Sequence, residues 1–224
     1  MGGMHWDMAI RDFVVDEFKK AHPDAEDPAK DTESFQKLYI DCEDAKKELS
    51  KLPSKTIIYY HPQKGAFKVV LTREKLLEIT SFLLAKTEAQ IDLIFQTVRE
   101  RHEADPATRA LIAPSDVDNV ILAGGSTRLL MVQEMLEKRF PGKLIGFDKV
   151  DPDQCVSVGA AWYGWLKSKN GGDQTDGGVI EVASHSIGIL AEDPDDGNVK
   201  VFPLILKDTK LPFQKADASV VSHK

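Results

Sequence analysis

Residues 117–130, VDNVILAGGSTRLL, constrain the fold of this chain more than any other stretch. A continuous apolar run of this type is found in strands that are buried on both faces. It ends at two glycines, after which a helical pattern covers about 127–139. A second apolar run follows at 143–147, and then a helix with an acidic start at about 151–168. Strand, helix, strand and helix at this spacing predict two parallel strands joined by a right-handed crossover.

The glycine turn lies where such units bind ligands, beyond the carboxyl ends of the strands. Glycine has no Cβ and lets the backbone approach a ligand, and the first N–H groups of a helix favour negative charge. One interpretation is a ligand-binding turn in which Arg128 lays its guanidinium on an aromatic base. The other is an ordinary strand-to-helix turn with Ser126 or Thr127 as the helix cap. The turn has neither the phosphate-loop lysine motif nor the dinucleotide glycine fingerprint.

The first hundred residues predict helices on both sides of a β-hairpin. Apolar residues recur at helical spacing over about 6–21 and 31–52. Two β-rich runs flank Pro62–Gly65, which indicates a hairpin. Residues 72–102 then predict a long helical region, either as one helix or as two that meet near Thr87.

The pattern changes again after residue 168. Residues 169–178 contain four glycines and no large apolar side chain, which is typical of a linker. Short β runs follow over 179–224, and the sequence EDPDDGN between two of them favours a turn. These runs are too few for a free-standing sandwich. We therefore expect an incomplete β segment, in a chain that begins and ends inside larger domains.

A polar helix face is a second candidate site. Glu43, Lys46, Lys47 and Ser50 are spaced i, i+3, i+4 and i+7, which places them on one stripe opposite an apolar stripe. A carboxylate can bind ribose hydroxyls, and lysines with a serine can contact the edges of adenine or the ribose. The alternative is a solvated face with a Glu43–Lys47 pair worth about 0.3–0.5 kcal/mol.

The start of the last helix offers a third candidate. Asp151 or Asp153 is suited to cap that helix, with Pro152 in its first turn. The functional alternative is that Asp153 orients the arginine or a ligand-bound water. Trp162 and Trp165, on the same helix, are expected in the core or at a subdomain contact rather than around a ligand.

Composition argues against several classes of protein. The chain of 224 residues has a formal charge of −7, which disfavours nucleic acid or an anionic membrane as the main partner. No stretch approaches the roughly 18 consecutive apolar residues of a membrane span, and the first residues do not look like a secretory signal. Cys42 and Cys155 predict two reduced core thiols, as in a cytoplasmic protein.

Several segments, taken in order, resemble the nucleotide-binding domain of the Hsp70 (DnaK-type) molecular chaperones. GGMHWD looks like the family's Gly-Gly-Glu-Asp-Phe-Asp, and CEDAKKELS is similar to its Cys/Ala-Glu-x-Ala-Lys-x-x-Leu-Ser helix. VILAGGSTRLL is close to Val-Ile-Leu-Val-Gly-Gly-Ser-Thr-Arg-Ile-Pro. VDPDQCVSVGAA resembles Asn-Pro-Asp-Glu-Ala-Val-Ala-x-Gly-Ala-Ala. The tail VIEVASHSIGI looks like the Asp-Val-Thr-Pro-Leu-Ser-Leu-Gly-Ile that opens the family's substrate-binding β-domain.

The resemblance implies an α/β fold, the second lobe of an actin-like (ribonuclease H-like) ATPase, over residues 1–168. Subdomain IIA would cover about 1–21 and 103–168. Subdomain IIB would be an α+β insertion at about 22–102. The β segment after the linker would be the start of the substrate-binding domain.

The resemblance also implies an adenine nucleotide, ATP or ADP, as the ligand. The positions that it assigns to the nucleotide are Gly3, Glu43, Lys46, Lys47, Ser50, Gly124, Gly125, Ser126, Arg128, Leu129 and Asp153. It assigns no catalytic and no metal-binding residue to this chain. The family's phosphate-binding hairpins, its phosphate-contacting lysine and its catalytic glutamate match nothing here, and magnesium belongs with them. We therefore expect no ATP hydrolysis by this polypeptide alone.

By this resemblance the chain is part of an ATP-dependent, stress-response chaperone, and supplies the adenosine half of the site and the surface for a nucleotide-exchange factor. A J-domain co-chaperone is a further implied partner, and unfolded polypeptide clients belong to the intact protein. One alternative is a non-enzymatic interaction module or scaffold derived from this lobe. A weaker one is another actin-fold ATPase or sugar-kinase relative. The departures are Leu130 for proline, Gln154-Cys155 for Glu-Ala, Met4-His5-Trp6 for Glu-Asp-Phe, and a linker without the family's acidic-leucine run.

Overall fold

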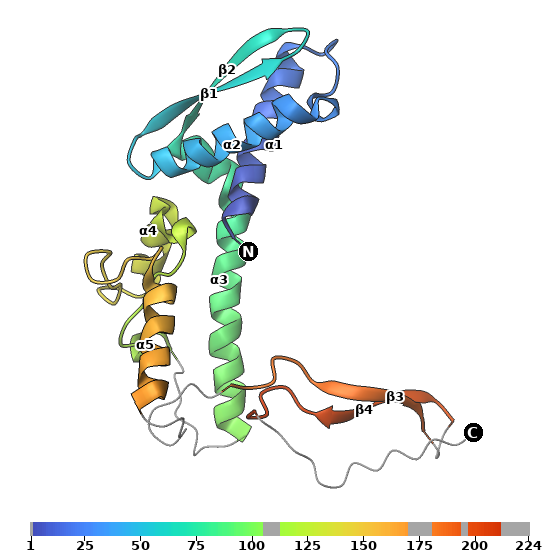
Figure 1. The fold of residues 1–224 in the computed structure, drawn as a ribbon, viewed down its shortest axis with the longest axis vertical. Coiled ribbons are helices and arrows are strands. Elements are labelled where there is room, and N and C mark those ends of the chain that lie inside the picture. Colours follow the sequence, from blue (N-terminus) through green and yellow to red (C-terminus); the bar gives the residue numbers. More distant parts are fainter. Residues whose placement is uncertain (1, 105–112, 170–180, 194–196, 212–224) are drawn as a thin grey trace. The chain divides into compact units, whose positions relative to one another are not determined.

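The computed structural model of this chain describes residues 2–104, 113–169, 181–193 and 197–211. The chain divides into two compact units, Met1–Gly159 and Ala160–Lys224, which are described separately below (Figure 1). The linker predicted at 169–178 lies, apart from Lys169, outside the described residues.

Helices α1 (Gly3–Ala21) and α2 (Thr32–Leu49) form where the apolar periodicity predicts them. Ile10, Val14 and Phe18 recur every four residues on α1, and all three are fully buried. The helix ends at Ala21 and is followed by the C-cap residue His22, whose backbone N–H donates to the carbonyl oxygen of Phe18, just before a proline. A single turn of 3₁₀ helix, η1 (Pro28–Lys30), connects α1 to α2.

The predicted hairpin is confirmed as β1 (Ser54–His61) and β2 (Gly65–Thr72), which pair antiparallel. Gly65 has φ 75°, a left-handed conformation that glycine adopts at no steric cost. Ile57, Tyr59 and His61 alternate with more exposed neighbours and face the helices.

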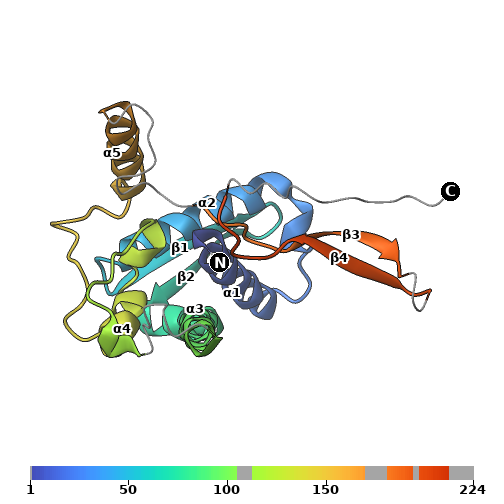
Figure 2. The same cartoon turned by 90° about the horizontal axis from the view of Figure 1, so that it is seen from below.

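The long helical region is one helix rather than two. Helix α3 spans Arg73–Ala104, 32 residues, and Figure 1 shows it from the side as one continuous helix, whereas Figure 2 looks nearly along its axis. The hydroxyl of Thr72 accepts a hydrogen bond from the backbone N–H of Lys75 at 3.2 Å, and so caps the start of this helix.

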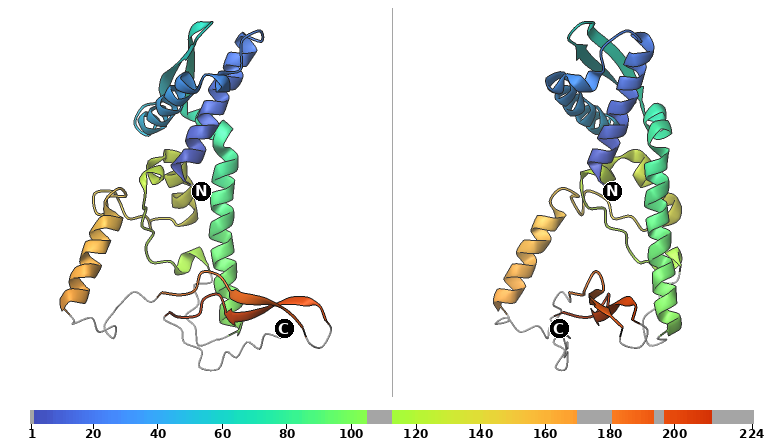
Figure 3. Two further views of the ribbon diagram at one scale, coloured as in Figure 1. Left: turned by 45° about the vertical axis from the view of Figure 1, so that its right-hand side comes forward. Right: turned by 90° about the vertical axis from the view of Figure 1, so that its right-hand side faces the viewer.

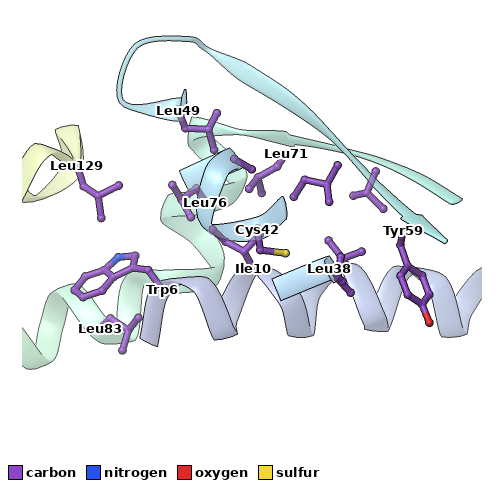
Figure 4. Close-up of a cluster of buried hydrophobic side chains, with 14 of the residues drawn as sticks. Trp6, Ile10, Leu38, Cys42, Leu49, Tyr59, Leu71, Leu76, Leu83 and Leu129 are labelled. Carbon is purple, nitrogen blue, oxygen red and sulfur yellow. The ribbon is translucent and has the colours of Figure 1, made fainter. Parts of the chain in front are cut away.

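The core of the first unit lies between these elements. Helices α1 and α2 pack on one side of the hairpin (Figures 1 and 4), and side chains of both helices meet those of the strands and of the first turns of α3. At one end, Phe18 stacks on His61 with ring centroids 4.8 Å apart and meets Tyr59 edge to face at 5.1 Å. Cys42 is a fully buried free thiol, whereas Cys155 is free but partly exposed, so only the first is a core thiol.

Residues 113–159 hold less regular structure than the sequence predicts. The strands expected at 117–123 and 143–147 are reduced to one parallel bridge between Val120 and Leu144, although the parallel direction is as predicted. Ile121 is 60% exposed, so this run is not buried on both faces. Two short strands without further neighbours are marginal, which explains why the pairing stops after one bridge.

The glycine turn also differs from the expected cap. It forms a 3₁₀ turn, η3 (Gly125–Arg128), and α4 (Leu130–Arg139) follows with Leu129 at its N-cap position. The hydroxyl of Thr127 donates to the carbonyl oxygen of Gly124 at 2.7 Å, so it closes the turn and does not cap α4. The prediction that Ser126 or Thr127 caps the helix is therefore wrong.

The last helix and the β segment complete the described chain. Helix α5 (Cys155–Lys169) crosses the boundary between the units, and β3 (Ile187–Glu192) pairs antiparallel with β4 (Val199–Ile205). Trp162 and Trp165 on α5 are 60% and 49% exposed and contact each other edge to face, so neither is a core residue in this structure. In the described part of the chain, no helix is both long enough and apolar enough to cross a membrane.

Candidate functional site

Gly3 is the point at which two of the predicted site segments meet. A Cβ built on Gly3 would lie 3.0 Å from Nζ of Lys46 on α2 and 3.1 Å from Oγ of Ser126 in the glycine turn. Both views in Figure 3 place the N-terminal end of α1 beside that turn. Residues 3, 46 and 126 are far apart in sequence. The fold brings Lys46 and Ser126 together beside Gly3, which has no side chain to separate them.

Lys46 forms an ion pair with a carboxylate on α1. Its Nζ lies 2.7 Å from Oδ1 of Asp7, and these side chains are 10% and 4% exposed. The same ammonium donates to the carbonyl oxygen of Gly3 at 3.3 Å. Lys46 therefore does not lie on a solvated stripe, because α1 covers this edge of α2.

The rest of the polar stripe is open. Lys47 lies 2.9 Å from Glu43 and 3.6 Å from Asp44, and the three side chains are 39–61% exposed. The hydrogen bond from Lys47 holds the pKa of Glu43 below its usual range, and the same bond raises the pKa of Lys47. Ser50 is half-buried at the end of α2, and its N–H donates to the carbonyl oxygen of Lys47.

The two glycines of the turn differ in backbone conformation and in what a side chain would meet. Gly124 has φ 87°, a conformation that side chains rarely adopt. Its N–H donates to the carbonyl oxygen of Pro152 at 2.8 Å, which ties the turn to the segment before α5. A Cβ on Gly125 would lie 3.4 Å from Oδ1 of Asp153, an ordinary contact distance. Gly124 is thus the position whose backbone conformation favours glycine, and Gly125 is where the turn lies against the acidic segment.

Arg128 is fixed by two carboxylates. Its Nε and Nη2 donate to Oδ2 of Asp153 at 3.0 and 2.7 Å, and Nη2 also donates to Oδ1 of Asp151 at 2.8 Å. The guanidinium carbon lies 5.3 Å from the ring centroid of Phe147. Asp153 thus contacts the arginine, as one of the two interpretations of the sequence expects. Asp151 accepts the N–H of Asp153 at 3.0 Å and so supports the local turn as well.

Leu129 lies apart from the other candidates. Its side chain is 3% exposed and belongs to the hydrophobic core around Leu76. A ligand at the turn would meet only the backbone of this residue.

Three residues around the site were not among the sequence candidates: Asp7, Asp44 and Phe147. Asp7 had a signal, because it is the last residue of the quoted segment GGMHWD, and an aspartate stands there in the family pattern as well. Asp44 also had a signal, because it stands three residues before Lys47 on the same helix, whereas Phe147 had none, because its contact with Arg128 depends on how two separate segments fold together.

The arrangement suits recognition of a planar polar molecule. Arg128 offers a guanidinium plane held in one orientation, and Glu43 offers carboxylate oxygens for hydroxyl groups. Within the described residues, no three His, Cys, Asp or Glu side chains gather in a way that would hold a metal ion.

Comparison with known proteins identifies the family. Residues 1–222 match the family described as Hsp70 protein. The chain is also similar to the chaperone protein DnaK of Mycoplasmoides gallisepticum, with 32% identity over 221 residues. The match covers 96% of this chain and 34% of that relative, so the chain spans about a third of its length. The chain belongs to the Hsp70 family, and its mixed helix and strand content is consistent with an α/β fragment of that family.

Proposed function

We propose that this chain forms the adenosine-binding part of an Hsp70-type nucleotide site. The observation that carries the proposal is that Lys46 and Ser126 both lie beside Gly3, which brings the helix face at Glu43–Ser50 close to the glycine turn. The bonds from Gly124 to Pro152 and from Arg128 to Asp153 extend the same group of contacts to the third candidate segment. Family membership supplies ATP or ADP as the general class of ligand.

In this proposal, residues 1–168 are the second lobe of the ATPase domain. Helix α1 and residues 103–168 form subdomain IIA, and residues 22–102 form the inserted subdomain IIB, with the hairpin and its helices. The segment after the linker is the start of the substrate-binding domain. Adenine would lie against the Arg128 guanidinium, and Glu43 would accept hydrogen bonds from the ribose hydroxyls.

The proposal is tested by isothermal titration calorimetry with adenosine and with ADP. Arg128→Ala should abolish binding because it removes the plane against which adenine lies. Glu43→Ala should abolish it because a hydrogen bond to a charged group is worth about 1.5–3 kcal/mol and the site has few of them. Lys64→Ala is the matched control, because Lys64 also pairs with an aspartate, Asp24 at 2.7 Å, but beyond the end of α1 that is far from Gly3. Loss of binding in the control as well would show that the effect is structural.

A second candidate function is an interaction module that uses the outer face of the hairpin. Tyr60 and Val70 lie on this face and are 49% and 59% exposed, opposite the face that the helices cover. In an Hsp70-type protein this face would belong to the exchange-factor surface, and a J-domain co-chaperone and clients would be partners of the longer protein. This function would be favoured if the folded chain bound no nucleoside at millimolar concentration but did bind an exchange factor. The Tyr60→Ala variant should then lose its binding to the exchange factor.

A further inference from the structure

Each cationic side chain at the proposed site forms an ion pair with one or two carboxylates. The ion pairs join Lys46 to Asp7, Lys47 to Glu43 and Asp44, and Arg128 to Asp151 and Asp153. Three cations are thus matched by five carboxylates, and the group has a formal charge of −2. The loop before Asp151 adds one charge of each sign, Asp148 and Lys149, and leaves this balance unchanged.

Asp151 is the second carboxylate that bonds Arg128, and it makes the net charge around this arginine negative. Nη2 of Arg128 donates to Oδ1 of Asp151 at 2.8 Å, and the same nitrogen also donates to Oδ2 of Asp153 at 2.7 Å. In the Hsp70 pattern quoted for this segment the position is asparagine, whose neutral amide oxygen would accept the same bond without adding a charge. The chain therefore has one carboxylate more on its arginine than the pattern requires.

We propose that this site binds the uncharged nucleoside, adenosine, in preference to AMP or ADP; this inference rests on the proposed function. The Arg128 nitrogens Nε and Nη2 are directed at carboxylates, so they are not directed at a phosphate. The planar face of the guanidinium suits a base, and the N–H groups of the turn suit hydroxyl oxygens. These N–H groups attract anions, but a helix start carries only about half a positive charge, which does not offset the formal charge of −2. A phosphate meets net negative charge, and each added phosphate weakens binding.

The ligand series is measured by calorimetry on the purified chain in magnesium-free buffer, with adenosine, AMP and ADP at 50 mM and at 500 mM salt. Adenosine should bind most tightly at low salt and should be insensitive to salt. The affinity for ADP should rise with salt, because screening shortens the Debye length from over 10 Å to about 4 Å and weakens repulsion. Tighter binding of ADP than of adenosine, weakened by salt, would overturn the inference.

Asp151→Asn tests the residue itself. The ratio of the ADP affinity to the adenosine affinity should rise about threefold, because one negative charge is removed near the diphosphate of ADP, whose own charge is about −3. The ratio is the readout because the variant also affects how Arg128 is held, which changes both affinities together. An unchanged ratio would contradict the proposed role of Asp151.

Asp24→Asn is the matched control. Asp24 is also an aspartate in an ion pair, with Lys64 at 2.7 Å, but it follows the far end of α1, a helix of 19 residues and about 28 Å. At that distance its charge is screened, and the ratio should not change. Failure of adenosine itself to bind would reject the proposed function, whereas adenosine binding with a strong ADP preference would reject only this inference.

Discussion

Lys46 and Asp7 form a buried ion pair that joins α2 to α1, with 2.7 Å between Nζ and Oδ1. Besides joining the two helices, the pair holds the Lys46 ammonium beside Gly3 and therefore beside the glycine turn. A buried charge is costly without its partner, so the contact that orders the site is also one that the fold requires.

Asp7→Ala should lower the free energy of unfolding by about 3–5 kcal/mol, because it leaves the Lys46 ammonium buried and unpaired. Urea unfolding followed by circular dichroism measures this value. The double variant Asp7→Ala/Lys46→Met should recover part of the loss, since it removes the stranded charge. Glu17→Ala, which breaks an exposed ion pair with Lys20 on α1, is the control and should leave stability unchanged within error. A loss in Asp7→Ala no larger than in the control would contradict the prediction.

Gly3→Ala should reduce binding of adenosine while leaving the protein folded. The new methyl group would lie 3.0 Å from Nζ of Lys46 and 3.1 Å from Oγ of Ser126, so both groups must move by a few tenths of an ångström. These are the ends of flexible side chains, and alanine favours the helix by up to about 1 kcal/mol over glycine, so stability should change little. Gly2→Ala is the matched control, because a Cβ there meets no atom within 4 Å. Equal nucleoside affinities in the two variants, measured by calorimetry, would contradict the role of Gly3.

Cys42 should make the protein less stable in alkaline solution. Burial raises the pKa of its thiol to about 12, so above the ordinary value of about 8.5 the unfolded chain loses a proton that the folded chain keeps. The free energy of unfolding should therefore fall by up to about 1.4 kcal/mol per pH unit from about pH 8.5 to pH 12. Urea unfolding at a series of pH values should show a shallower decline in Cys42→Ala than in Cys155→Ala. Equal slopes would count against the prediction.

Phe18→Ala should destabilise the first unit by about 3–5 kcal/mol. Phe18 is fully buried and contacts the rings of His22, Tyr59, His61 and Phe67, so its removal leaves a cavity at the end of the core. Phe82→Ala is the control, because Phe82 is 51% exposed on α3 and should cost much less. Similar losses for the two variants in urea unfolding would show that the core does not depend on this aromatic cluster.

The local patterns of the sequence predicted most of the first unit. The apolar stripe of α1, the hairpin around Pro62–Gly65 and the long helix after Thr72 depend on contacts between near neighbours, which periodicity records. The strands at Val120 and Leu144 were predicted from an apolar run alone. Their extent depends on neighbouring strands, and the described chain supplies only one bridge between them.

The site residues were predicted as types and segments but not as partners. The spacing predicted one polar stripe of Glu43, Lys46, Lys47 and Ser50. In the structure Lys46 is buried beside Asp7 of another helix, whereas the other three are more exposed. The second carboxylate on Arg128 likewise follows from how the segment at Asp151 folds against the turn. Pairing across elements depends on tertiary placement, which the spacing of one helix does not contain.

The most direct test of the account is a ¹H–¹⁵N chemical-shift map of the chain titrated with adenosine. Amide signals in three separate segments, at Gly3, at Glu43–Ser50 and at Gly124–Leu129, should shift together along one binding curve, and these shifts should disappear in Arg128→Ala. Shifts confined to one segment, shifts on the outer face of the hairpin alone, or no shifts at millimolar adenosine would contradict the account.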